Sequence, residues 1–252
     1  MGMGRTKRGL QQARERQLEY YNTTVANYDG SHVIAGDEHF IALEYIAAFI
    51  SVLPVRSVLD VGTGTGRGLE FLARRFPLLN VWGLEPASAM ATEASAKGLD
   101  IISGLGERLP FRDQSIDVSI STGAFHHVRD PKAVLAEMLR VSRVAIMISD
   151  ANRFGQGGRS IAFIKLALWR LGMWRAVNWI STSGKGYRQS DGDGIFYSYS
   201  VYDSIEALWT WSSRVFTIPT GSARLSLLAP LAGSPTALLV GIREPIVGWA
   251  GR

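Results

Sequence analysis

The stretch that decides the fold runs from Val58 to Gly68 and reads VLDVGTGTGRG. A short apolar run leads into alternate glycines, and a helical pattern follows over residues 67–76. Glycines let the backbone turn sharply and let a ligand approach without a Cβ in the way, and the N-terminus of the next helix favours negative charge. The stretch therefore predicts a strand, a ligand-binding loop and a helix.

Outward from this loop, short β-type runs alternate with helical patterns. The predicted strands are 57–61, 80–84, 100–103, 116–121, 144–149, 214–218 and 236–242. The predicted helices are 38–53, 67–76, 87–96, 131–141 and 202–211. Such alternation indicates a mostly parallel sheet with helices on both faces, so we expect an α/β fold of the Rossmann-like type with seven strands.

Breaks in this rhythm divide the chain into four segments. Residues 1–19 are predicted to be a charged N-terminal tail or frayed helix, and residues 20–150 the ligand-binding core with N-terminal cap helices. Residues 151–200 are rich in Gly, Trp and Arg and predict a helical and aromatic insertion between strands 5 and 6, while residues 201–252 complete the sheet. We expect the insertion to form the substrate side of the site or a lid.

The composition excludes several classes of protein. Of the 252 residues, 46% are hydrophobic and 19% charged, which rules out a disordered or fibrous chain. Cysteine is absent and only four histidines are present, so disulfides and thiolate chemistry are excluded and we expect no metal site. The run Asp191–Gly194 resembles the start of a calcium loop, but the remaining ligands, including the closing Glu, are missing.

Charge is unevenly distributed, although the net charge is only +5. Residues 1–16 carry five Lys and Arg against one Glu, and residues 151–190 carry seven against no acid, which points to an anion near one part of the molecule. The small net charge and the lack of a recognisable RNA-binding module argue against a nucleic-acid partner. A polar N-terminus and the lack of an apolar run of roughly 18–20 residues predict a cytoplasmic protein without a transmembrane segment.

A carboxylate follows the glycine loop at an informative distance. Nicotinamide dinucleotide sites have the pattern G-x-G-x-x-G, whereas here Arg67 stands where the third glycine would be. Glu85 ends the next predicted strand, nineteen residues after Gly66, where a carboxylate can accept two hydrogen bonds from a ribose diol. Asp60, directly before the loop, is placed for a ligand amine or its waters.

Four blocks, in this order, resemble class I S-adenosylmethionine-dependent methyltransferases of the ubiquinone/menaquinone-biosynthesis type (methyltransferase domain 11-like). The blocks are LDVGTGTG at 59–66, GLEP at 83–86, GERLPF at 106–111 followed by Asp117, and STGAFHH at 121–127 leading to Asp130-Pro131 and EMLRV at 137–141. The run YNTTVANYD at 21–29 is similar to the family's N-terminal cap motif. The resemblance covers residues from about 20 to 150.

The resemblance implies S-adenosylmethionine as cofactor and a role for each matching residue. Asp60, Gly62, Thr63 and Gly64 would hold the methionine part, Glu85 and Pro86 the ribose, Gly106 and Glu107 the adenine, Ser121 the methionine end, and Tyr21 and Tyr28 the carboxylate. Leu105 stands where the family often has an acidic residue for the adenine amine. The adenine would then depend on backbone groups and on apolar packing against Leu84 and Met90.

Three residues are candidates for proton transfer. Methyl transfer from a sulfonium needs mostly alignment, and a general base helps where the acceptor is a hydroxyl or a protonated amine. His126 and His127 follow the fourth predicted strand, and Asp150 ends the fifth. Alternatively, the two imidazoles hydrogen-bond locally and Asp150 caps Asn152.

The insertion supplies the candidates for acceptor binding, namely Trp169, Trp174, Tyr197 and Tyr199, with ordinary core packing as the alternative. It could also be the contact of a homodimer. We expect a methyltransferase that acts on oxygen or nitrogen of a small biosynthetic intermediate, which could be anionic or aromatic. The alternatives are an enzyme that cyclises or cleaves the cofactor, an RNA methyltransferase, and a non-catalytic binding protein.

Overall fold

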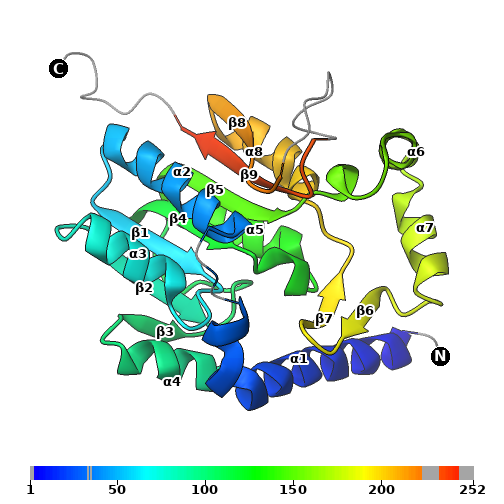
Figure 1. The fold of residues 1–252 in the computed structure, drawn as a ribbon, viewed down its shortest axis with the longest axis horizontal. Coiled ribbons are helices and arrows are strands. Elements are labelled where there is room, and N and C mark those ends of the chain that lie inside the picture. Colours follow the sequence, from blue (N-terminus) through cyan, green and yellow to red (C-terminus); the bar gives the residue numbers. More distant parts are fainter. Residues whose placement is uncertain (1–2, 33, 35, 223–232, 244–252) are drawn as a thin grey trace.

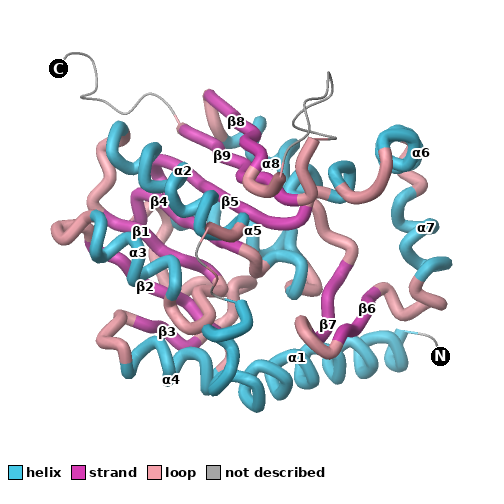
Figure 2. Tube along the Cα trace, in the orientation of Figure 1, coloured by secondary structure: helices cyan, strands magenta, loops and turns pink. Residues whose placement is uncertain are grey.

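The computed structural model describes residues 3–32, 34, 36–222 and 233–243. Within them, seven strands form one sheet in the order β3-β2-β1-β4-β5-β9-β8 (Figure 2). Their bounds are Ser57–Val61 (β1), Asn80–Glu85 (β2), Ile101–Ser103 (β3), Ile116–Thr122 (β4), Ser142–Ala151 (β5), Arg214–Pro219 (β8) and Thr236–Ile242 (β9). Strand β9 is antiparallel to β5 and β8, and the other pairs are parallel. The expected seven-stranded, mostly parallel α/β sheet is confirmed.

Helices cover both faces of this sheet. Their bounds are Met3–His32 (α1), Glu38–Val52 (α2), Arg67–Arg75 (α3), Ser88–Ala96 (α4), Pro131–Val141 (α5), Arg159–Arg170 (α6), Trp174–Ser181 (α7) and Ile205–Trp211 (α8), with 3-10 turns at Phe125–His127 (η1), Arg153–Gly155 (η2) and Val201–Ser204 (η3). Helices α2 and α3 pack on one face, and α5 and α8 on the other. In β5, Ala145 and Met147 pack in the core beneath α2 and α3, and Ile146 and Ile148 pack in the core beneath α5 and α8. A strand buried at successive positions is what a doubly covered sheet requires.

Local sequence explains where the helices beside the sheet begin. The Asp37 carboxylate accepts a hydrogen bond from the Phe40 amide at 2.7 Å and caps α2. The Asp130 carboxylate caps α5 in the same way, with Pro131 at the first helical position. Side-chain oxygens at these places satisfy amides that have no partner within the helix.

The N-terminal segment is more ordered than the sequence predicts. Residues 3–32 form one continuous helix, so the expected boundary after residue 19 falls inside α1 (Figure 1). Ala13 and Gln17 are buried, at 1% and 6% exposed, because α1 lies against β7, and the Asn22 side chain accepts a hydrogen bond from the Ala89 amide at the start of α4. Tertiary contacts, invisible in a charged and polar sequence, hold this helix.

The insertion contains α6, α7 and a separate antiparallel hairpin of β6 (Tyr187–Ser190) and β7 (Gly194–Tyr197). An ion pair with a buried guanidinium attaches it to the core: Arg153 donates two hydrogen bonds of 2.7 and 3.0 Å to the half-buried Asp203 carboxylate. The Trp169 indole donates to the same carboxylate at 3.1 Å. The insertion is therefore fixed against η3 through one charged centre.

Among the described residues, no helix combines the length and the apolar character needed to cross a membrane.

We predict that Asp203→Ala lowers the free energy of unfolding by about 3–5 kcal/mol, because it leaves the Arg153 guanidinium buried without its partner. Urea unfolding measures the change. Asp113→Ala is the matched control, since the Asp113 side chain is 75% exposed in its pair with Arg140, and it should cost at most about 1 kcal/mol. Equal losses in the two variants would contradict the anchoring role of Asp203.

Candidate active site

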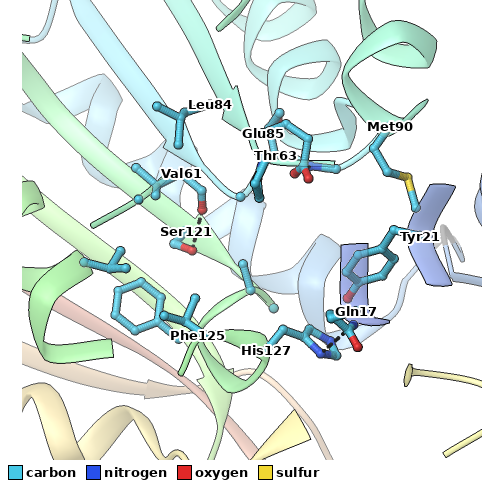
Figure 3. A pocket seen from close by; sticks show the side chains of 18 of the residues that line it. Gln17, Tyr21, Val61, Thr63, Leu84, Glu85, Met90, Ser121, Phe125 and His127 are labelled. Atoms are coloured by element: carbon cyan, nitrogen blue, oxygen red, sulfur yellow. Dashed lines mark hydrogen bonds between the residues drawn. The ribbon is translucent and has the colours of Figure 1, made fainter. Parts of the chain in front are cut away.

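A pocket opens at the carboxyl edge of the sheet, where the strand order reverses between β1 and β4 (Figure 3). Such switch points are where open α/β sheets bind ligands. We call it the glycine-loop pocket. The sequence-predicted residues that line it are Tyr21, Tyr28, Gly62, Thr63, Gly64, Glu85, Pro86, Gly106, Glu107, Ser121, His127 and Tyr197. Leu84, Met90 and Leu105 add an apolar wall.

The loop after β1 needs glycine for geometric reasons. Gly62, Gly64 and Gly66 have φ angles of 77°, 59° and 91°, a region that favours glycine. A Cβ on Gly62 would lie 2.5 Å from the Cβ of Ala124, so the loop could not keep its place beside the end of β4. The loop therefore presents its backbone to the pocket.

Glu85 fixes the position of this loop. Its two carboxylate oxygens accept hydrogen bonds from the Gly64 amide at 2.9 Å and from the Ala87 amide at 2.8 Å. Burial, only partly opposed by these bonds, raises the pKa of Glu85 to about 7. Each oxygen retains a lone pair, so this carboxylate can still accept hydrogen bonds from a hydroxyl-bearing ligand.

Asp60 lies beneath the loop and does not line the pocket. Its Oδ2 accepts the Thr63 hydroxyl at 3.0 Å, and its Oδ1 has no hydrogen-bond partner among the described residues. Burial raises the pKa of Asp60 to about 6. The helix that follows accommodates the carboxylate with Gly68, where a Cβ would lie 2.5 Å from Oδ2. Contact of Asp60 with a ligand stays a prediction.

One face of α1 closes the pocket. Arg14, Gln17 and Leu18 line it beside Tyr21 and Tyr28. The rings of the two tyrosines meet edge to face at 6.0 Å. The first three residues were not predicted from the sequence, although their intervals of three, four and seven along the chain are those of one helix face.

The candidate proton-transfer residues converge. His126, His127, Asp150 and Asp193 form what we call the His–Asp cluster. Nδ1 of His126 lies 2.8 Å from Oδ1 of Asp150, and Nε2 of His126 lies 3.5 Å from Oδ2 of Asp193. Nε2 of His127 lies 3.2 Å from Oδ1 of Asp193. The sequence had offered Asp193 only as a calcium ligand, so its place here was missed.

Electrostatics within the cluster limit what His126 can do. Burial lowers the pKa of this imidazole, but the carboxylates of Asp150 and Asp193 outweigh it and raise the pKa to about 10. Burial opposes the ionisation of Asp150, yet the His126 charge and hydrogen bond hold its pKa below the ordinary range. With these neighbours alone, His126 is protonated at neutral pH and cannot accept a proton.

A second pocket, which we call the insertion pocket, lies on the other side of the cluster. It is lined by Trp174, Tyr197 and Tyr199 of the predicted acceptor residues, and by His126 and Asp193. Trp169 lines neither pocket and instead packs against Phe154, with ring centroids 5.6 Å apart. Since Tyr197 lines both pockets, the cluster and this ring stand at their junction.

Two cations line the insertion pocket without a carboxylate partner among the described residues. Lys165 donates to the carbonyls of Arg153 and Gln156, and Arg188 contacts the Ser181 hydroxyl at 3.4 Å. Burial and the positive charges of Arg153 and Arg188 lower the pKa of Lys165. An anionic group in this pocket would relieve that repulsion.

Comparison with known proteins identifies the central segment. Residues 59–145 match the family described as a methyltransferase domain. The chain is 37% identical over 86 residues to a demethylmenaquinone methyltransferase of Thermotoga maritima, and 28% identical over 130 residues to a malonyl-[acyl-carrier protein] O-methyltransferase of Methylococcus capsulatus. These alignments cover 33% and 50% of this chain, and 38% and 44% of the relatives. The chain thus spans less than half the length of these curated relatives.

Solved structures extend the likeness to most of the fold. A S-adenosylmethionine-dependent methyltransferase of Thermotoga maritima, described as a possible histamine N-methyltransferase, has a TM-score of 0.60 at 18% identity and covers 90% of this chain and 100% of its own. The plantazolicin methyltransferase, solved in complex with S-adenosylhomocysteine, has a TM-score of 0.56 at 15% identity, with 94% and 99% covered. The resemblance and the fold predicted from the sequence are both confirmed.

We predict that Gly62→Ala destabilises the chain more than Gly98→Ala. Both glycines have positive φ, and alanine there costs about 1–2 kcal/mol. Only at Gly62 does the new Cβ also meet another atom, because Gly98 has nothing within 4 Å. Urea unfolding of both variants measures the difference, and equal losses would contradict the close approach of the loop to β4.

Proposed function

Because the chain has the fold of class I S-adenosylmethionine-dependent methyltransferases and matches a methyltransferase domain over residues 59–145, we propose that it is a methyltransferase. It moves a methyl group from S-adenosylmethionine to oxygen or nitrogen of a small acceptor. The observation that carries the proposal is the buried Glu85 carboxylate. It is tied to Gly64 and Ala87 and faces the glycine-loop pocket.

The pocket offers each part of the cofactor a chemically suitable wall. Glu85 accepts the ribose hydroxyls, while Leu84, Met90 and Leu105 pack the adenine beside Gly106 and Glu107. The Ser121 hydroxyl donates to the Val61 carbonyl at 2.7 Å, which leaves its oxygen lone pairs for the methionine end. Tyr21 and Tyr28 cover the methionine carboxylate from α1.

Alignment supplies most of the catalysis. The lone pair of the acceptor forms a bond to the methyl carbon while the carbon–sulfur bond breaks, and that electron pair stays on sulfur. The acceptor proton leaves, and the products are the methylated acceptor and S-adenosylhomocysteine. Holding the two reactants in line can contribute roughly 7–11 kcal/mol. His127 lines the cofactor pocket and His126 lines the insertion pocket, so the two imidazoles stand at the junction where an acceptor would meet the methyl group.

The insertion pocket is the proposed acceptor site. It meets the cofactor pocket at Tyr197 and the His–Asp cluster, so an acceptor bound there would reach the methyl group from the insertion side. Aromatic walls from Trp174 and Tyr197, together with Lys165 and Arg188, favour an anionic aromatic acceptor. The cation-rich segment 151–190 would thus supply the positive charges that bind the acceptor.

We also retain the homodimer through the insertion as a proposal. Several large apolar side chains of α6 and α7 are more than half exposed: Phe163 (57%), Ile164 (59%), Trp179 (64%) and Ile180 (71%). Contiguous exposed apolar groups mark contact surfaces.

We predict that S-adenosylhomocysteine binding releases a proton from Glu85 near pH 7. The unliganded carboxyl has its pKa raised to about 7 by burial, and ribose hydroxyls donate better to the ionised form, so binding lowers this pKa. Affinity should therefore rise with pH between about 6 and 8, with about half a proton released at pH 7. Calorimetry in buffers of different ionisation enthalpy measures the release.

Glu85→Gln is the control, since it removes the titrating group at nearly constant size. It should weaken binding and abolish the proton release, while its circular dichroism shows that the fold is kept. The same release in both proteins would refute the ribose role of Glu85.

We predict that the chain forms S-adenosylhomocysteine only when an acceptor is present, and that Arg188→Gln raises the KM of an anionic aromatic acceptor by about tenfold. A screen of phenolic and heteroaromatic acids, followed by mass spectrometry, provides the assay. Arg175→Gln, an exposed cation of α7 outside both pockets, should leave KM unchanged. Methylthioadenosine formed from the cofactor alone would instead indicate cleavage or cyclisation.

A further inference from the structure

The His–Asp cluster has the geometry of a metal centre, although the sequence alone predicted none. We propose that Nε2 of His126, Nε2 of His127 and a carboxylate oxygen of Asp193 bind one divalent transition-metal ion, with Zn²⁺ as the first candidate. The candidate ligand atoms of these three residues all lie within 4.8 Å of one another. His126 and His127 come from η1 and Asp193 comes from the hairpin, and these two segments lie far apart in the sequence.

The separations between these atoms fit ligands around a common ion. Tetrahedral Zn²⁺ with bonds of about 2.0–2.1 Å places neighbouring ligand atoms about 3.3 Å apart. Nε2 of His126 lies 3.5 Å from Oδ2 of Asp193, and Nε2 of His127 lies 3.2 Å from Oδ1, so the two imidazoles face the two oxygens of one carboxylate. The 3.5 Å separation is longer than a charge-assisted hydrogen bond, which is usually about 2.7–2.9 Å.

The partners behind the imidazoles are those of metal-binding histidines. Such residues usually use one ring nitrogen for the ion and donate the other N–H to a carboxylate or a backbone carbonyl. Nδ1 of His126 lies 2.8 Å from the buried Asp150 carboxylate, and Nδ1 of His127 lies 2.8 Å from the Ile195 carbonyl. The shorter contact of Nδ1 of His127 is the one to the Ile195 carbonyl, which requires a proton on Nδ1, while the Gln17 amide nitrogen lies farther away at 3.2 Å. Both Nε2 atoms turn toward Asp193.

Charge supports a divalent ion. Two carboxylates, Asp150 and Asp193, flank the two imidazoles, and the Asp150 side chain is wholly buried. An ion of charge +2 bound to neutral imidazoles neutralises both carboxylates without any protonated histidine. Two nitrogens and a carboxylate oxygen suit Zn²⁺ and its neighbours better than Mg²⁺ or Ca²⁺, which prefer oxygen ligands.

The position of the metal site would let the bound ion contact the acceptor. Three protein ligands leave a coordination position open, as in catalytic rather than structural zinc sites. The cluster stands at the junction of the two pockets, and the Asp193 side chain is 45% exposed, so solvent and an acceptor can reach it. If the proposed methyl transfer holds, an acceptor hydroxyl on the open position would lose its proton at neutral pH.

The first test uses the full chain without an affinity tag, stripped with a chelator and titrated with Zn²⁺ in a calorimeter. We expect one ion per chain, released again by the chelator. Co²⁺ added to the stripped chain in place of Zn²⁺ should give the intense visible absorption of a four- or five-coordinate site with nitrogen ligands, and Zn²⁺ added afterwards should remove that absorption. This spectrum needs no variant and so does not depend on a mutant folding.

Variants then test the ligands. His127→Gln and Asp193→Asn should each weaken Zn²⁺ binding by more than about 100-fold, and Asp150→Asn by about 10–100-fold, because it acts through His126. Asp191→Asn is the matched control: it removes the same charge two residues away, while the hydrogen bond from Tyr20 goes to its backbone carbonyl and is kept. It should leave the affinity within about twofold of the native chain.

The proposal is overturned if the native chain takes up no stoichiometric Zn²⁺, or if Asp191→Asn weakens binding as much as Asp193→Asn. Calorimetry of S-adenosylhomocysteine with the metal-free chain separates this result from the proposed function. Nucleoside binding without metal uptake refutes the metal site alone, and metal uptake without nucleoside binding refutes the methyltransferase proposal alone.

Discussion

The structure depends on two hydrogen bonds to one carboxylate. Glu85, at the end of β2, holds the amide of Gly64 in the neighbouring loop and the amide of Ala87 ahead of α4. These bonds draw the glycine loop of β1 against the next strand and leave its backbone facing a pocket. They also keep an acid in an apolar interior, where it is half protonated near neutrality. The Glu85 side chain thus sets the shape of the glycine loop and places an ionisable group in the wall of the glycine-loop pocket.

A second convergence joins parts of the chain that are distant in sequence. Gln17 of α1 contacts Nδ1 of His127 at 3.2 Å and also reaches the hairpin, where its side chain accepts the Ile195 amide. The same hairpin brings Asp193 to the two histidines. Helix, sheet edge and insertion therefore meet at one polar centre, which separates the two pockets and belongs to both.

Much of the fold could be predicted because the sheet and the glycine loop are local in sequence. Strand patterns bounded by glycine and proline gave the strands of the sheet, and regular spacing along the chain placed Glu85 beside the loop. Residues that act through tertiary contact were out of reach. Gln17 and Asp193 are polar residues in polar segments. The packing of the hairpin on α1 gives Gln17 its neighbours, and the packing of the hairpin on η1 gives the Asp193 carboxylate its two histidines. The burial of Asp60 beneath the loop was also not visible in the motif, and its contact with a ligand stays a prediction.

Helix α1 runs along the pocket and is attached near its C-terminus and at its middle. Toward its C-terminus, Asp29 pairs with Lys97 at 2.6 Å and accepts the Thr65 hydroxyl, and toward its middle Gln17 is bound to the hairpin. A nucleoside bound in the proposed site would lie beneath this helix, next to the attachments at Asp29 and Gln17. In the proposed reaction, release of S-adenosylhomocysteine would be coupled to the opening of the contact between Gln17 and the hairpin.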